Sequence, residues 1–200
     1  MLPLLLVPAA LALMLVKLRG GRITDLGGVR IVAPWFLLAV SGLQLARILG
    51  VHAAISVLGP QSHHSGNAIV FVLVAAWLVV NLVIGEPRMA LAWISMAIGL
   101  LANALVIAAN GYMPYSLQAA RWSGAAGDVI GTTADGYQPI VAETNLRVLA
   151  DVIPVPLTGK SISLGDVMMM AGAFLGVLCA CGVLRVRIAM PFRRGVPSLG

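Results

Sequence analysis

Five long runs of apolar residues, almost free of charge, constrain this chain more than any other feature of its sequence. A helix needs about twenty apolar residues to cross the hydrocarbon core of a bilayer. The runs predict membrane spans at about residues 2–18, 31–50, 67–85, 89–109 and 163–183. We therefore predict an all-α membrane protein. One bundle of five transmembrane helices fills residues 1–184, and a basic cytoplasmic tail fills 185–200.

The composition supports a membrane protein over a water-soluble domain. Hydrophobic residues make up 60% of the 200 residues and charged residues only 10%, whereas a soluble domain carries about 25% charged residues. The expected location is the cell membrane, with several passes, and the lipid bilayer is the first expected partner.

The distribution of charge predicts the orientation of the helices. The positive-inside rule places basic flanks in the cytoplasm, so we expect the N-terminus outside, the C-terminus inside and an uncleaved first span. No aromatic-basic surface motif accompanies the cations, so no nucleic-acid partner is expected. The expected inner cations are Lys17, Arg19, Arg22, Arg30, Arg88, Arg185, Arg187, Arg193 and Arg194, and the outer ones are Arg47, Arg121, Arg147 and Lys160.

A long polar segment, residues 110–162, separates the fourth and fifth runs and is predicted to be an outer loop. Connections of this length inside a compact fold are usually functional or disordered. Residues Leu117 to Trp122 suit one helical turn lying on the membrane, and Gly124 to Tyr137 suit a flexible loop. A short helix is expected over Glu143 to Ala150 and an extended piece over Asp151 to Pro156, where two prolines fix the backbone.

Arg47 and Asp166 are the sharpest pair of candidate functional residues, because both fall toward the outer ends of their spans. Ionisable groups inside spans are rare and usually paired. Three interpretations stay open. Arg47 can reach the headgroups while Asp166 caps the first turn of the last helix, the two can form an ion pair between helices, or they can line a path for substrate or protons.

Polar and small residues inside the runs are candidates for helix packing. Gln44, Asn81 and Asn103 lie deep in the second, third and fourth runs, where amides either hydrogen-bond between helices or line a ligand cavity. Gly172, Gly176 and Ala180 share one face of the last run. Small residues at this spacing let two helix backbones approach closely, within the bundle or against a partner.

No arrangement of residues indicates catalysis, a metal or a cofactor. The histidines His52, His63 and His64 have no cysteine or acid at ligand spacing. The methionines at 168–170 suit packing better than metal binding, and Asp128 and Asp135 lack the spacing of a calcium loop. Cys179 and Cys181 point to different helix faces and cannot bridge each other. We therefore expect a non-enzymatic protein with no cofactor and no metal.

Three elements in the second half resemble those of a known family. They are Asn110-Gly111-Tyr112-Met113-Pro114, Asp151-Val152-Ile153-Pro154-Val155-Pro156 and Ser161-Ile162-Ser163-Leu164-Gly165-Asp166. Together they resemble a domain-of-unknown-function family of small bacterial membrane proteins with five spans. The last element reads S-L-G-D here, where the family has S-I-G-D. The resemblance implies no activity, but it implies an ordered outer cap containing Asn110, Gly111, Met113, Pro114, Asp151, Pro154 and Pro156.

These observations predict an accessory or assembly subunit of a larger bacterial membrane complex, with a respiratory or photosynthetic complex as a conceivable host. Other membrane subunits are then further partners. The alternative is a small transporter or channel with a polar path near Arg47 and Asp166. A membrane enzyme working at the outer surface ranks last.

Overall fold

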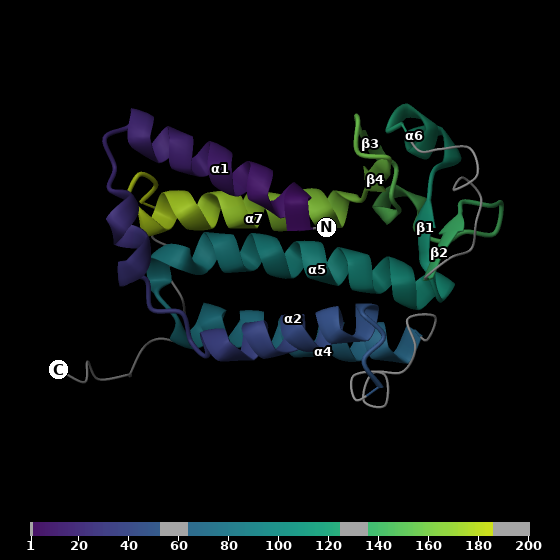
Figure 1. Ribbon diagram of the computed structural model, residues 1–200, viewed down its shortest axis with the longest axis horizontal. Helices are drawn as coiled ribbons and strands as arrows, with labels where there is room; N and C mark the ends of the chain where they lie inside the picture. The colour runs from purple at the N-terminus through teal and green to yellow at the C-terminus, as the bar shows by residue number, and fades with distance from the viewer. Residues whose placement is uncertain (1, 53–63, 125–135, 186–200) are drawn as a thin grey trace.

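The computed structural model describes residues 2–52, 64–124 and 136–185, without the side chains of 2–6, 44, 47, 48 and 64–69. The described chain is mostly helical, and its long helices coincide with the apolar runs (Figure 1). They are α1 (Leu2–Leu18), α2 (Pro34–Ile48), α4 (His64–Ile84), α5 (Ala90–Asn110) and α7 (Leu164–Ala180). Helix α1 continues through Pro8 without a break.

One helix of the described chain, Pro87–Asn110, is both long and apolar enough to cross a membrane. Four further apolar helices, at Val7–Leu18, Pro34–Leu43, Val70–Ile84 and Leu164–Ala180, are shorter. The five predicted helical segments are therefore present, while five membrane spans stay a prediction.

Helix α5 occupies the centre of the helical bundle, as Figure 1 shows. It packs against α7 on one side and α4 on the other, α1 packs against α7, and α2 packs against α4. Between α4 and α5, the rings of Trp77 and Trp93 meet edge to face at 5.4 Å. Between α1 and α7, a smaller core contains Ala12, Val16, Leu178 and Cys181.

At one end of the bundle, the amide of Asn81 holds the chain that leads into α2. Its Oδ1 accepts a hydrogen bond from the Val32 amide at 2.8 Å, and its Nδ2 donates to the Val32 carbonyl at 3.1 Å. The indole of Trp77 donates to the same carbonyl at 2.9 Å. Asn81 is fully buried. This amide therefore serves chain packing within the bundle.

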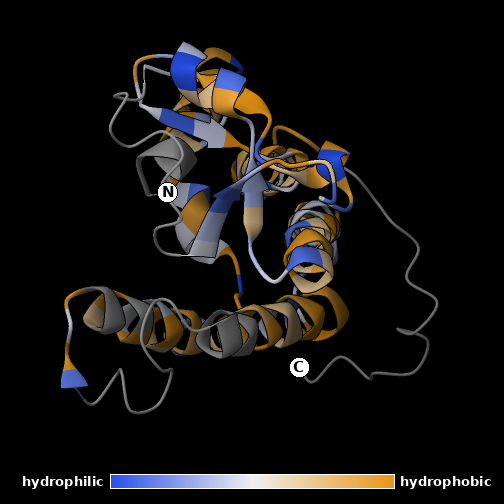
Figure 2. Cartoon of the chain, turned by 90° about the vertical axis from the view of Figure 1, so that its right-hand side faces the viewer, coloured by the Kyte–Doolittle hydropathy of each residue, from blue (hydrophilic) through white to orange (hydrophobic). Residues whose placement is uncertain are grey.

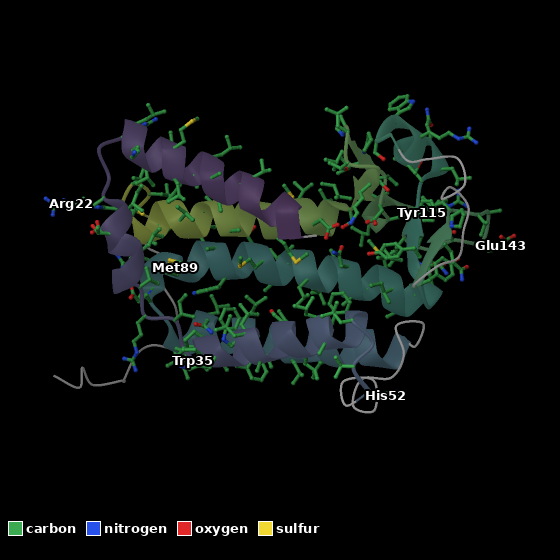
Figure 3. The ribbon with its side chains drawn as sticks, viewed as in Figure 1. Arg22, Trp35, His52, Met89, Tyr115 and Glu143 are labelled. Carbon is green, nitrogen blue, oxygen red and sulfur yellow. The ribbon has the colours of Figure 1, made fainter. Side chains whose placement is uncertain are left out.

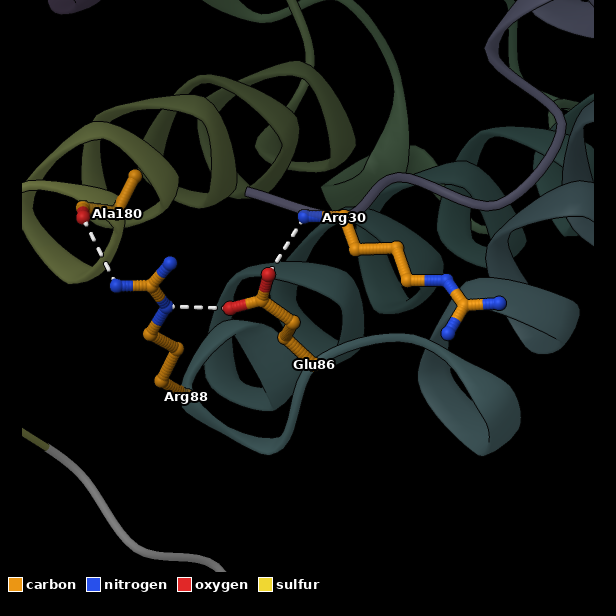
Figure 4. Close-up of polar contacts among 4 residues, drawn as sticks. All are labelled: Arg30, Glu86, Arg88 and Ala180. Carbon is orange, nitrogen blue, oxygen red and sulfur yellow. Dashed lines mark hydrogen bonds and ion pairs between the residues drawn. The ribbon is translucent and has the colours of Figure 1, made fainter. Parts of the chain in front are cut away.

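Glu86 links three parts of the chain at this end, beside the short 3-10 helix η2 (Pro87–Met89) (Figure 4). One carboxylate oxygen accepts from the Arg30 amide at 2.5 Å, and the other pairs with Arg88 Nε at 2.5 Å. Arg88 also donates to the carbonyl of Ala180 at 3.2 Å, at the end of α7. A second 3-10 helix, η1 (Ile23–Gly28), connects α1 to α2.

At the other end of the bundle, the described parts of residues 111–163 form an ordered cap, as the resemblance implies, and this cap contains strand pairs that the sequence did not predict. Strand β1 (Met113–Tyr115) pairs in parallel with β2 (Tyr137–Pro139), and β3 (Ile153–Val155) pairs antiparallel with β4 (Lys160–Ile162). The apolar periodicity of the sequence did not predict these pairs, because they are short and are held together by main-chain hydrogen bonds. Figure 2, which views this end of the bundle, shows hydrophilic residues interspersed with hydrophobic ones on the cap.

The remaining cap elements match the expectations unevenly. Helix α6 (Leu117–Trp122) forms where a helical turn was predicted. The predicted helix over Glu143 to Ala150 is wrong in extent, because only a 3-10 turn, η4 (Arg147–Leu149), forms there. Most of the predicted flexible segment Gly124 to Tyr137 lies outside the described residues.

The labelled side chains in Figure 3 mark the two ends of the bundle. Figure 3 shows Arg22 and Met89 at the end with η1 and η2, and Tyr115 and Glu143 at the cap end. His52 also lies toward the cap end and is exposed.

Candidate functional site

A buried polar cluster lies where the cap meets α5 and α7. Asp166, in the first turn of α7, forms a capping box with Ser163. The Ser163 hydroxyl accepts from the Asp166 amide at 3.0 Å, and Asp166 Oδ2 accepts from the Ser163 amide at 3.2 Å. Two backbone N–H groups that would otherwise lack partners at the start of the helix are thereby satisfied. The Asp166 half of the first interpretation, capping of the last helix, is confirmed, while its Arg47 half stays a prediction.

Asn103 of α5 completes the cluster. Its Nδ2 donates to Asp166 Oδ1 at 2.9 Å, and its Oδ1 accepts from the Ser163 hydroxyl at 2.7 Å. All three residues are buried. Both oxygens of Asp166 thus accept hydrogen bonds from neutral donors, and Asn103 joins two helices as predicted for an amide inside a span.

The predicted pairing of Arg47 with Asp166 stays a prediction. The backbone of Arg47 belongs to α2, but its side chain lies outside the described part of the chain, as does that of Gln44. No described cation pairs with Asp166.

Glycines explain why Asn103 can reach the cluster. A Cβ on Gly165 would collide with the amide of Asn103 and with the carbonyl of Gly99, at 2.6 Å from the latter. Gly99 belongs to α5 and faces α7. A Cβ on Gly99 would lie 2.9 Å from the Met169 amide nitrogen. The absence of both side chains lets the helices approach until an asparagine spans the gap.

The same seam, defined by Gly99, Gly165, Gly172 and Gly176, continues along α7. A Cβ on Gly172 would lie 2.9 Å from the Ala92 carbonyl, which is too close. At Gly176 the nearest atoms are 3.5 Å away, which is ordinary contact. Ala180 is buried at the end of the seam. The predicted small-residue face of the last helix therefore lies against α5 within the bundle.

Asp151 lies at the point where three cap segments meet. Its amide donates to the Pro114 carbonyl at 2.9 Å, and its carbonyl accepts from the Ser116 amide at 2.9 Å. These bonds form a parallel bridge with Tyr115 beside β1. The side chain is 3% exposed, and its Oδ1 has no hydrogen-bond partner among the described residues.

Burial changes the acidity of Asp151. Removal from water, with a smaller contribution from the charge of Asp166, raises the pKa of Asp151 from 3.8 to about 8. Tyr137 shares this environment. Although 39% of that residue is exposed, desolvation of its hydroxyl and the charges of Asp151 and Asp166 raise its pKa to about 12. The cap therefore holds a carboxyl group that stays mostly protonated at neutral pH.

The cap is attached to the end of α5 through paired asparagines. Asn110 Oδ1 accepts from the Asn145 amide at 2.8 Å, and Asn110 Nδ2 donates to the Asn145 carbonyl at 3.0 Å. Gly111 follows with φ +76°, the left-handed conformation that glycine readily adopts after the end of a helix. Arg147 then donates to the Val141 carbonyl at 2.9 Å and holds the intervening turn.

The other predicted cap residues are also placed. Met113 and Pro114 are buried in β1, Pro154 pairs with Ser161 in the β3–β4 hairpin, and Pro156 opens its turn. The described residues contain no group of three His, Cys, Asp or Glu that could hold a metal. Cys179 and Cys181 are free and buried. His63, Asp128 and Asp135 lie outside the described residues, as does the side chain of His64.

Sequence reasoning named Ser163 and Gly165 only as part of the S-L-G-D element, without a role, and it did not name Gly99. The signal for Ser163 was available, because Ser-x-x-Asp before an apolar run is a capping-box pattern. Gly99 stands alone in its run, so only the packed structure reveals its partner.

Most of the chain matches one known protein family. Residues 29–178 match the model of a family of unknown function, DUF5317. No curated protein and no solved structure matches the chain. The matched residues extend from the lead into α2 to the last turn of α7 and include the whole cap. Because the match covers well over half of the sequence, the chain belongs to the DUF5317 family.

Proposed function

We propose that this protein is an integral membrane protein whose five long helices all cross the bilayer. The observation that supports this is the exposure of large apolar side chains along the outer faces of the bundle. In water these side chains would form an extended apolar surface of a kind that soluble monomers rarely expose. They include Leu11 and Met14 of α1, Trp35 and Leu38 of α2, Val72 and Val79 of α4, and Ile98 and Leu101 of α5.

The proposed orientation places the cap outside and η1 and η2 in the cytoplasm. Arg22, Arg30 and Arg88 lie in or beside the connections at the η1–η2 end, as the positive-inside rule requires of cytoplasmic flanks. The two ends of the bundle therefore provide labelling sites on opposite faces of the membrane.

Cysteine labelling tests this orientation. Arg22→Cys and Glu143→Cys, each in a Cys179→Ala/Cys181→Ala background, are exposed to a membrane-impermeant maleimide in right-side-out vesicles. Glu143→Cys should react at once, and Arg22→Cys only after the membrane is permeabilised. Equal reaction of both sites in sealed vesicles would refute a membrane-spanning bundle.

Within the membrane, we propose that the protein acts as a non-enzymatic accessory or assembly subunit of a larger complex. The supporting observation is that the buried polar side chains of the helices are engaged in internal hydrogen bonds. Asn81 binds Val32, Asn103 binds Asp166 and Ser163, and Ser95 donates to the Met168 carbonyl at 2.8 Å. Polar groups used in this way stabilise a bundle. Among the buried side-chain donors of the described helices, Trp93 Nε1 is left without a hydrogen-bond partner.

Native purification in mild detergent, from cells that express the protein at its own level, tests the subunit role. We expect stoichiometric co-migration with defined membrane polypeptides, retained through two independent separations. An isolated monomer at native expression would count decisively against the proposal.

A small transporter is the second candidate function, favoured by the unpartnered buried oxygen of Asp151 close to Asp166 at the cap end. In proteoliposomes, this function requires a flux that Asp166→Asn or Arg47→Gln abolishes. A flux unchanged by both substitutions would exclude a path through these residues.

A further inference from the structure

Two parts of the cap combine into one projecting unit, which we call the finger. It consists of α6 (Leu117–Trp122) and the β3–β4 hairpin (Ile153–Ile162), which contact each other. The amide of Gly159 in the hairpin turn donates to the carbonyl of Ser123 at 2.9 Å, directly after α6. Ala119, Ala120 and Ser123 are buried, so one side of α6 is packed and not exposed to solvent.

The tip of the finger carries an unusual leucine. Leu157 is fully exposed, at 100% of its surface, and its φ is +65°. It follows Pro156 in a turn closed by the Thr158 amide on the Val155 carbonyl, and a positive φ at this position of a Pro-containing turn normally requires glycine. A bulky residue there is strained. Leu157 thus combines backbone strain with maximal exposure of an apolar side chain.

The turn is held in place by further hydrogen bonds. The Thr158 hydroxyl donates to the Val155 carbonyl at 2.8 Å and accepts from the Lys160 amide at 3.2 Å. Leu157 is therefore displayed by an ordered turn, and an apolar environment outside the chain would compensate for its exposure.

The residues around Leu157 have the composition of a membrane interface. Trp122 at the end of α6 is 69% exposed, and tryptophan is enriched at the headgroup level of membranes. Arg121 and Lys160, on α6 and β4, are both exposed cations. Their charge complements the phosphates of anionic lipids.

The finger lies at the level of the helix ends. Strand β4 ends at Ile162, immediately before Ser163, which caps α7. Figure 1 draws α6, β3 and β4 beyond the start of α7 on the side of the bundle where α1 lies, while β1 and β2 lie at the far edge of the cap. A bilayer that surrounds the helices would thus meet the finger at its outer surface.

We propose that the finger is an interfacial anchor that inserts Leu157 and Trp122 into the outer leaflet and binds anionic lipid phosphates through Arg121 and Lys160. This inference rests on the proposed membrane-spanning bundle. It assigns the apolar tip to lipid and not to a partner subunit.

The test uses the full chain in nanodiscs, with a single cysteine at each site in the Cys179→Ala/Cys181→Ala background and an environment-sensitive NBD label. Leu157→Cys reports on the finger. Val72→Cys, on the exposed face of α4, reports on insertion of the bundle, and Glu143→Cys reports on an exposed part of the cap away from the finger. The nanodiscs contain phosphatidylcholine alone or mixed with phosphatidylglycerol.

We expect blue-shifted emission and quenching by lipid-borne nitroxides at positions 72 and 157, with water-like emission at 143. Phosphatidylglycerol should increase quenching at 157, and Arg121→Gln/Lys160→Gln should remove that increase, while Arg22→Gln at the other end should preserve it. Water-like emission at 157 with an apolar signal at 72 overturns the anchor alone. Water-like emission at 72 overturns the membrane bundle itself. Insertion at 157 that ignores phosphatidylglycerol overturns the assignment to anionic lipid.

Discussion

The side-chain amide of Asn103 donates to the carboxyl group of Asp166 at 2.9 Å, across the seam between α5 and α7. The contact joins residues 63 positions apart and is possible because Gly165 leaves room for the amide. One asparagine thereby connects the packing of two central helices to the capping of α7 and to the base of the cap.

Replacing Asn103 with alanine should destabilise the bundle. The change removes the partners of both Asp166 Oδ1 and the Ser163 hydroxyl, and buried polar groups left without partners cost about 1–3 kcal/mol each. Denaturant unfolding in detergent measures the loss. Leu101→Ala, on the exposed face of the same helix, is the control and should have a much smaller effect. Equal losses in the two variants would contradict a special role for the amide.

The glycines of the seam should respond differently to alanine. Gly172→Ala places a methyl group against the Ala92 carbonyl and should destabilise by roughly 1–3 kcal/mol, as overpacking does. Gly176→Ala meets only ordinary contacts at 3.5 Å, so it should be neutral or stabilise by about 0.5–1 kcal/mol through helix propensity. Thermal unfolding of the two variants distinguishes them, and the reverse order would disprove the described seam.

Asp151 should make the cap less stable as pH rises. The unfolded chain releases this proton near pH 3.8, while the folded chain retains it until about pH 8. The folded state therefore binds more protons across this window, and stability falls between the two values and stays low above them. Asp151→Asn should flatten the pH dependence of the free energy of unfolding. At neutral pH it should raise that free energy by on the order of 4 kcal/mol, before any cost of burying the new amide.

Unfolding curves of wild type and Asp151→Asn, recorded from about pH 5 to 9, measure this effect. Glu143→Gln, which removes an exposed carboxyl from the same cap, should leave the wild-type slope unchanged. If Asp151→Asn also keeps that slope, the inference that the folded cap buries a protonated carboxyl group is wrong.

Removing the carboxylate of Glu86 should loosen the η1–η2 end. Glu86→Ala eliminates its bonds to the Arg30 amide and to Arg88, and because the pair is partly exposed the loss should be roughly 1–2 kcal/mol. Arg30→Ala is a close control, since Arg30 contributes its backbone amide to this contact. Hydrogen exchange at the backbone amide of residue 30 should accelerate in Glu86→Ala and stay slow in Arg30→Ala. Unchanged protection in Glu86→Ala would contradict the link.

The long apolar runs predicted the positions of the helices because burial and helix geometry act on many residues at once. The left-handed glycine after Asn110 was predictable for a local reason, since chain reversal after a helix favours Gly. The pairing of β1 with β2 was not predictable, because each strand is three residues long and its partner lies far along the chain. Strand β3 lies within the extended piece predicted over Asp151 to Pro156, but its partner β4 was not predicted. The same limit applies to Asn103, whose role depends on a glycine in another helix.

Asp151 illustrates a different limit. The family resemblance implied that Asp151 belongs to an ordered cap, but sequence alone assigns a solvated acid its ordinary charge. Only the folded cap reveals that the carboxyl is enclosed and that one oxygen has no described partner.

The position of α7 has a consequence for how the chain is assembled. Helix α1 packs chiefly against α7, and Ala12 and Val16 form a buried cluster with Leu178 and Cys181. Helix α1 (Leu2–Leu18) comes long before α7 (Leu164–Ala180) in the chain, so its inner face stays uncovered until α7 has been synthesised. The face of α5 that receives the glycines of α7 stays uncovered for the same interval, so both surfaces remain available for contacts with other proteins until α7 is in place.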